Sequence, residues 1–135
     1  MKEEDHEMKR NMDLVRLILL EIENIYQSTA IYNLTIDGYD AEMIAYHCKI
    51  IHEAGLISDY KAQYADNKLY SFGVGSLTWD GNDFLDKIRD DSQWKKVKDA
   101  ITKEGLPLII ETIKSVANAF ISATVTGITT SILKG

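Results

Sequence analysis

The segment from Asp40 to Trp79 constrains the fold more than any other part of the chain, because it reads as a helix followed by a two-stranded hairpin. Apolar residues recur every three or four positions as far as Ile51, which is the spacing of one helical face. Gly55 follows, and glycine readily adopts the left-handed turn at a helix C-terminus. The hairpin is predicted as a strand over residues 56–60, a polar wing over residues 61–69 and a strand over residues 70–79.

The same periodicity predicts three further helices and one short strand. These are a helix over residues 11–26, a strand over 31–36, a helix over 80–103 that breaks near 90–92, and a last helix from about Pro107. Asp40 and Asp80 are placed to cap the helices that follow them. We therefore predict an α+β, winged-helix-like fold: helix, short strand, helix, two-stranded wing hairpin and helix, with an additional C-terminal helix. The predicted core holds Leu17, Ile18, Ile44, Ile51, Trp79, Phe84 and Leu85.

The length of 135 residues is sufficient for one domain with its own core. Residues 1–7 are expected to form a disordered tail, because they are charged and lack the apolar stretch of a signal peptide. Residues 8–105 are predicted as the winged-helix-like domain and residues 106–135 as the C-terminal helix. Cys48 is the one cysteine, so an internal disulfide is excluded and a reducing, cytoplasmic location is expected.

The formal net charge of −6 disfavours nucleic-acid binding, because contacts to phosphate supply much of the affinity of DNA-binding proteins. Residues 40–55 contain one lysine and three acidic residues, a sum of 1 − 3 = −2. In a winged helix, the exposed side of this helix enters the major groove of DNA, and the wing contacts the backbone. The candidate residues for contact with nucleic acid or with a protein partner are Tyr46, Lys49, His52, Lys61 and Lys68.

Three stretches carry a resemblance to a known family: Met12–Glu23, Ile44–Ile57 and Leu77–Lys98. In this order they extend across most of the range 8–105, from Met12 to Lys98, and on them the chain resembles the DUF2513 family of short bacterial and phage-associated proteins. The resemblance implies a trimmed winged helix in which a strand replaces part of the usual helix-turn-helix, with no catalytic residue and no established ligand. It also implies a lysine-rich C-terminal helix, and this chain departs from that feature.

No residue pattern in the sequence indicates an enzyme, a cofactor or a metal site. Cys48 and His52 have the spacing of two metal ligands on a helix, but no third ligand lies near them in the sequence. His47 faces the predicted core, where we expect it to be hydrogen-bonded rather than to act as a base. Asp80 is explained as an N-cap, and Asp83 and Asp86 are explained by the helix dipole, which favours carboxylates in a first turn.

The last predicted helix contains no charged residue from Ser115 to Leu133. Its many serine and threonine residues make it polar for a membrane span. A row of small residues every fourth position allows two helices to approach closely. We predict self-association through Ile113, Ala119, Phe120, Ala123 and Gly127. Packing on the chain's own domain is the second alternative, and membrane contact is the third.

The patterns and the resemblance together predict a homodimeric, non-enzymatic interaction or regulatory protein of phage or prophage type, with no cofactor and an unidentified protein partner. The alternative is a winged-helix DNA-binding transcriptional regulator. A weaker alternative is a membrane-associating adaptor.

Overall fold

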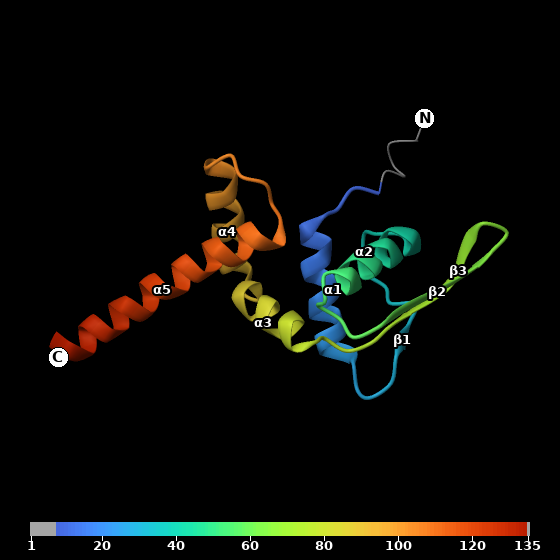
Figure 1. The fold of residues 1–135 in the computed structure, drawn as a ribbon, viewed down its shortest axis with the longest axis horizontal. Coiled ribbons are helices and arrows are strands. Elements are labelled where there is room, and N and C mark those ends of the chain that lie inside the picture. The colour runs from blue at the N-terminus through green and yellow to red at the C-terminus, as the bar shows by residue number, and fades with distance from the viewer. Residues whose placement is uncertain (1–7, 135) are drawn as a thin grey trace. The chain divides into compact units, whose positions relative to one another are not determined.

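The computed structural model describes residues 8–134, so the tail expected over residues 1–7 lies outside the described residues. Over the described range the chain forms five helices and three strands (Figure 1). It divides into two compact units, of which the first ends at Leu85 and the second begins at Asp86. The elements are α1 (Met12–Ile25), β1 (Ile31–Tyr32), α2 (Ala41–Glu53), β2 (Tyr60–Ala65), β3 (Lys68–Val74), α3 (Trp79–Ile88), α4 (Asp91–Lys103) and α5 (Ile110–Lys134). The predicted α+β class is confirmed: a two-stranded hairpin and a short strand form one sheet, and an additional helix follows at the C-terminus.

In the first unit, α1 and α2 pack against each other, and His47 joins them. The side chain of Asn11 caps α1 by accepting from the Leu14 amide, and that of Asp40 caps α2, as predicted, by accepting from the Met43 amide. His47 Nε2 accepts from the backbone N–H of Asn11 at 2.8 Å, and His47 Nδ1 lies 2.9 Å from the Met43 carbonyl oxygen. The buried side chains of these two helices include Leu14, Ile18, Leu19, Ile22, Ile44, Cys48 and Ile51.

The predicted end of the second helix at Gly55 is confirmed, and it has the geometry of a Schellman motif. Gly55 has a φ of 81°, and its N–H donates to the His52 carbonyl at 2.9 Å. The N–H of Leu56 donates to the Ile51 carbonyl at 3.1 Å. These two bonds satisfy carbonyls that the end of a helix leaves without intrahelical partners.

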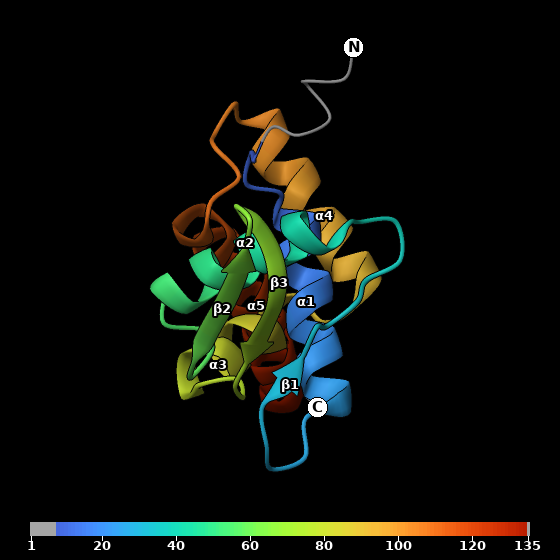
Figure 2. The same cartoon turned by 90° about the vertical axis from the view of Figure 1, so that its right-hand side faces the viewer.

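The three strands form one antiparallel sheet in the order β1–β3–β2 (Figure 2). The strand predicted over residues 31–36 is wrong beyond Tyr32, because Asn33 takes a left-handed conformation with a φ of 56°. The side-chain oxygen of Asn33 accepts from the Phe72 N–H at 3.0 Å, and the Asn33 N–H donates to the Phe72 carbonyl at 2.8 Å. The asparagine therefore ends the ladder while satisfying the backbone of β3.

The hairpin starts later and has a shorter loop than the sequence predicted. β2 begins at Tyr60 instead of residue 56, β3 ends at Val74 instead of residue 79, and most of the predicted wing over residues 61–69 is strand. The loop consists of Asp66 and Asn67, whose φ values of 53° and 64° fit a two-residue type I′ turn. Most side chains of the outer half of the hairpin are exposed, so the strands lack the apolar alternation by which a half-buried strand is recognised.

The third helix begins at Trp79, so the prediction of Asp80 as its N-cap is wrong. The hydroxyl oxygen of Thr78 accepts from the Gly81 N–H at 3.0 Å, and the hydroxyl donates to the Gly55 carbonyl at 2.5 Å. Trp79 therefore lies in the first turn of α3, where it is 85% exposed, and its predicted place in the core is wrong. Of the other predicted core residues, Leu17 is half-buried, whereas Ile18, Ile44, Ile51, Phe84 and Leu85 are buried.

In the second unit, α4 and α5 pack against each other. The side chain of Asp90 caps α4 by accepting from the Gln93 amide at 2.9 Å, which confirms the predicted break near residues 90–92. α5 begins at Ile110 rather than at Pro107, because the Thr112 hydroxyl bonds the backbone of residues 107 and 109 ahead of the helix. The buried side chains of this unit are Ile88, Trp94, Val97, Ile101, Ile113 and Ala117.

Candidate functional site

The surface predicted to contact a partner lies where the β2–β3 hairpin packs against α2. Ala45 is 3% exposed and Tyr46 is half-buried, although the sequence placed Tyr46 on the free side of the helix. The hairpin therefore covers a second face of α2, in addition to the face that packs on α1. The residues of α2 that stay exposed are Ala41, Glu42, Lys49, His52 and Glu53.

A groove of about 140 Å³ lies between α2 and the hairpin. We call it the α2–hairpin groove. Its lining residues are Met8, Glu42, Ala45, Tyr46, Lys49, Tyr60, Tyr64 and Leu69. The structure thus brings two of the five candidate contact residues, Tyr46 and Lys49, to one site. His52, Lys61 and Lys68 are exposed on α2, β2 and β3 and are not among the lining residues.

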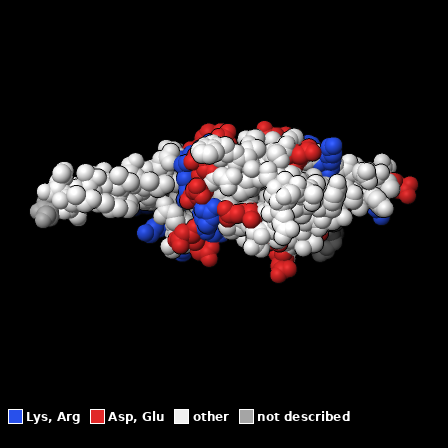
Figure 3. Space-filling model, turned by 90° about the horizontal axis from the view of Figure 1, so that it is seen from below, with Lys and Arg blue, Asp and Glu red and all other residues white. Residues whose placement is uncertain are grey.

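Lys and Arg side chains do not form a continuous basic area on the face of the molecule that Figure 3 shows. There, Lys and Arg atoms lie next to Asp and Glu atoms. The ammonium of Lys49 lies 3.3 Å from the carboxylate of Glu53, and both side chains are more than half exposed. Such an exposed pair contributes little to stability, but it offsets the charge that Lys49 would present to a phosphate.

Tyr60 and Tyr64 are the lining residues that the sequence reasoning missed. Tyr60 lies opposite Val74 in the sheet, and a register shift between Gln63 and Tyr64 brings Tyr64 opposite Leu69. Tyrosines at every fourth position of a strand share one face, so their spacing was a usable signal. The strand predicted over residues 56–60 ends before Tyr64, so it does not place the two tyrosines on one strand.

The hydroxyl of Tyr60 is held in its neutral form. Burial is the main cause that raises the pKa of Tyr60 to about 12, followed by the proximity of Tyr64 and Cys48 and by a hydrogen bond to Tyr64. Burial likewise raises the pKa of the Cys48 thiol to about 12. The Tyr60 ring in the groove is therefore neutral at physiological pH, and the nearby Cys48 thiol is not an activated nucleophile.

His47 and the pair Cys48–His52 have structural positions. Burial lowers the pKa of His47, against the opposing effect of its bond to the Met43 carbonyl, and both ring nitrogens are engaged. Cys48 is fully buried, whereas His52 is exposed. Among residues 8–134, no group of three or more histidine, cysteine, aspartate or glutamate side chains is arranged to hold a metal ion.

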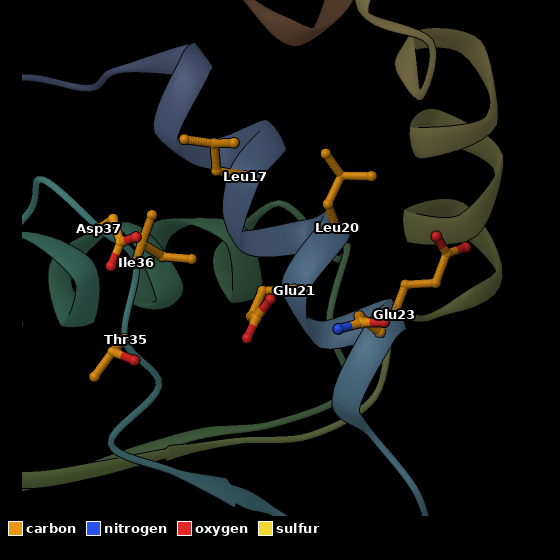
Figure 4. Close-up of a pocket in the computed structure, with 8 residues that line it drawn as sticks. Leu17, Leu20, Glu21, Glu23, Thr35, Ile36 and Asp37 are labelled. Atoms are coloured by element: carbon orange, nitrogen blue, oxygen red, sulfur yellow. The ribbon is translucent and has the colours of Figure 1, made fainter.

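A second groove of the first unit lies between α1 and the loop after β1 (Figure 4). Its lining residues are Leu17, Leu20, Glu21, Glu23, Asn24, Thr35, Ile36 and Asp37. Glu21 points toward this loop, whereas Glu23 extends away from it, so the carboxylates do not converge on one point. This groove is acidic and open, and it contains no arrangement for general acid–base chemistry.

Of the residues of α5 that were predicted for self-association, some are buried within the second unit and others are exposed to solvent. Ile113 is fully buried within the second unit, and Phe120 is half-buried in a shallow groove that Gln93 of α4 also lines. Ala119, Ala123 and Gly127 are exposed, as is every residue from Ile121 to Leu133. The sequence reasoning missed an apolar row on this exposed part, which consists of Ile121, Val125, Ile128 and Ile132. We call it the α5 seam.

Comparisons with known proteins were consistent with one another. Residues 9–107 match the model of a family described as "Hypothetical protein (DUF2513)". This match ends before α5 begins at Ile110. A protein of Haemophilus influenzae named "Uncharacterized protein" is 42% identical over 118 residues, which are 85% of this chain and 97% of that protein. No solved structure matches the chain.

Proposed function

The chain belongs to the DUF2513 family, and on that premise we propose that it is a non-enzymatic interaction protein that works as a homodimer. The observation that carries the proposal is the α5 seam. Its residues follow one another at steps of four, three and four, and alternating steps of three and four residues keep apolar side chains on one seam between two helices. The second copy of α5 is the occupant with a matching seam.

The exposed state of the seam supports an interface. α5 has 25 residues, which gives it a length of about 37 Å at 1.5 Å per residue. Only 6% of its most apolar window is buried, and no charge interrupts the helix between Ser115 and Leu133. Contiguous apolar surface of this kind marks interaction sites in soluble proteins. The seam is less than two heptads long, so we expect the dimer to form at high protein concentration.

The buried reactive groups support a non-enzymatic role. The Cys48 thiol is buried and has a raised pKa, and both nitrogens of His47 are used within the fold. Neither group meets the requirement that a nucleophile or base reach its substrate. The phage or prophage association and the cytoplasmic location stay predictions.

The membrane alternative is favoured by one observation. α5 is long and apolar enough to cross a bilayer, with a mean hydropathy of 1.4 and at most two charged residues in its most apolar window. Its exposed part also carries hydroxyl side chains on the sides away from the seam, including Ser122, Thr126 and Thr129. These groups favour a helix with one apolar side over one that is apolar all round.

The DNA-binding alternative is favoured by Lys61 and Lys68, which are exposed on the hairpin where a wing would contact DNA. Against it, the hairpin covers part of α2, and Lys49 is paired with Glu53. The exposed residues of α2 then present more acidic than basic groups to an approaching phosphate.

A charged residue in the seam tests the proposal. We expect Val125→Glu to convert a concentration-dependent dimer into a monomer, because it places a carboxylate in the centre of the apolar row. Light scattering on the eluting protein measures the mass, and circular dichroism confirms that the fold is retained. Thr126→Glu is the matched control, since it adds the same charge to the neighbouring position on another side of α5 and should leave the dimer intact.

Two results contradict the seam as the interface. If the wild-type chain stays monomeric at high concentration, the proposed homodimer is wrong. Dissociation by Ala123→Glu but not by Val125→Glu would place the interface on the row of small residues. Partition of the wild-type chain into lipid vesicles, lost in Val125→Glu, would favour the membrane adaptor instead.

A further inference from the structure

The α2–hairpin groove has an aromatic lining that the proposed dimer does not use. Tyr46 contributes one ring from α2, and Tyr60 and Tyr64 contribute two from β2. The three tyrosines reach one groove only because the hairpin folds back over α2. The face of a neutral aromatic ring carries negative electrostatic potential and attracts a cation that lies over it.

The charges at the groove also favour a cation. The carboxylate of Glu42 is exposed and has no ion-pair partner among residues 8–134. Lys49, the one basic lining residue in that range, lies 3.3 Å from Glu53 on the next turn of α2. A phosphate or carboxylate in the groove would be repelled by the Glu42 carboxylate, whereas a cation would be attracted to it.

The volume of the groove favours a single side chain over a larger ligand. Small-molecule sites usually enclose about 300–1,000 Å³. The α2–hairpin groove, at about 140 Å³, is well below that range and has room for one long side chain. Arginine and lysine carry a cation on such a side chain, and arginine also stacks on aromatic rings.

We propose that the α2–hairpin groove binds a single cationic side chain, arginine or lysine, which an exposed segment of a partner protein presents. Tyr46, Tyr60 and Tyr64 surround the cation, and Glu42 supplies the opposite charge at the rim. This site lies in the first unit and does not depend on the α5 seam, so the two proposals fail or succeed separately.

Peptide titration of the full-length, isotope-labelled chain tests the proposal. The probe is a five-residue peptide of glycine and serine with one central arginine, and its matched control carries citrulline, which has nearly the same shape without the charge. We expect the arginine peptide to shift the amide signals of α2 and β2 with millimolar affinity, and the citrulline peptide to leave them unchanged. Equal binding of both peptides, or no saturable binding of either, would overturn the proposal.

Three variants connect the binding to the groove. Tyr64 is 65% exposed, so Tyr64→Leu removes a ring without opening the core, and we expect it to weaken binding about 3- to 30-fold. Glu42→Gln should weaken binding and reduce its dependence on salt. Tyr70→Leu is the control, because Tyr70 is 73% exposed on β3 and does not line the groove. Unchanged binding in Tyr64→Leu would overturn the assignment.

A nucleic-acid ligand is the competing explanation for an aromatic groove, because tyrosine rings also stack on unpaired bases. A single-stranded thymidine oligonucleotide provides the comparison. Tight binding of this oligonucleotide that is lost in Tyr64→Leu and raised in Glu42→Gln would overturn the cation assignment. Failure to bind it, together with the arginine selectivity above, would support a protein partner.

Discussion

His47 shows at the scale of one residue how a titratable group can hold two helices together. Its Nε2 atom accepts the N–H of Asn11 at the start of α1, and its Nδ1 atom lies 2.9 Å from the Met43 carbonyl within α2. Only the neutral ring can do both, because a protonated imidazole has no acceptor. Burial is the main cause that lowers the pKa of His47, and a lowered pKa also favours the neutral ring.

The stability of the fold should therefore fall as the pH is lowered through the range where an unfolded histidine takes up a proton. The folded-state pKa is lowered, so the unfolded state binds the proton first, below an ordinary pKa of about 6.5. The contribution of neutral His47 to the free energy of unfolding is complete above that pH. It decreases as the pH falls toward the pKa of His47 in the folded state. We expect the urea midpoint to decrease between about pH 7.5 and pH 5.5.

The variants His47→Gln and His52→Gln form a matched pair for this measurement. His47→Gln should lower stability at neutral pH and flatten the pH dependence, because the amide does not titrate. His52→Gln should change little, since His52 is exposed at the end of α2. An unchanged pH profile in His47→Gln would show that another group causes the dependence.

At the scale of elements, the sequence predicted helices well and strands poorly, for a physical reason. Helical faces and caps leave signals over many residues, such as Asp40, Gly55 and Asp90. The strands are set by particular local features: Asn33 ends β1, and the Asp66–Asn67 turn fixes the hairpin register. Because the outer half of the hairpin is exposed on both faces, its sequence lacks the alternation of apolar and polar residues and resembles that of a loop. The tyrosines of β2 that line the α2–hairpin groove were missed for the same reason.

The start of α3 gives a prediction at this scale, because Gly81 approaches the backbone of Leu56, three residues after α2, too closely for any side chain. A Cβ atom at Gly81 would lie 2.0 Å from the carbonyl oxygen of Leu56. We expect Gly81→Ala to destabilise the chain by about 1–3 kcal/mol, as overpacking commonly does. Gly127→Ala is the control, since no atom lies within 4 Å of its added Cβ and alanine favours a helix. Equal thermal midpoints for the two variants would contradict the close approach.

At the scale of the whole molecule, charge and exposure assign different surfaces to different units. The chain has a net charge of −6 and a pI near 5.0, yet α5 carries no charge from Ser115 to Leu133. The first unit contains both grooves and the exposed acidic residues of α2, and the second contains the α5 seam. The proposed contact with a second copy and the proposed contact with a partner's cationic side chain therefore lie on different residues and are separable by mutation.

Nucleic-acid binding is the property that the whole-molecule charge opposes most directly. We expect no sequence-specific complex with duplex DNA at about 0.15 M salt, because a net negative protein must overcome repulsion before its few lysines can reach phosphates. Fluorescence anisotropy with a randomised pool of labelled duplexes measures this, and Lys49→Glu with Lys68→Glu serves as the matched variant. If the hairpin and α2 did contact DNA, each lost phosphate contact would reduce the salt slope by about 0.9. A tight, sequence-selective complex that loses about two such contacts in the double variant would reverse the ranking and make the chain a winged-helix regulator.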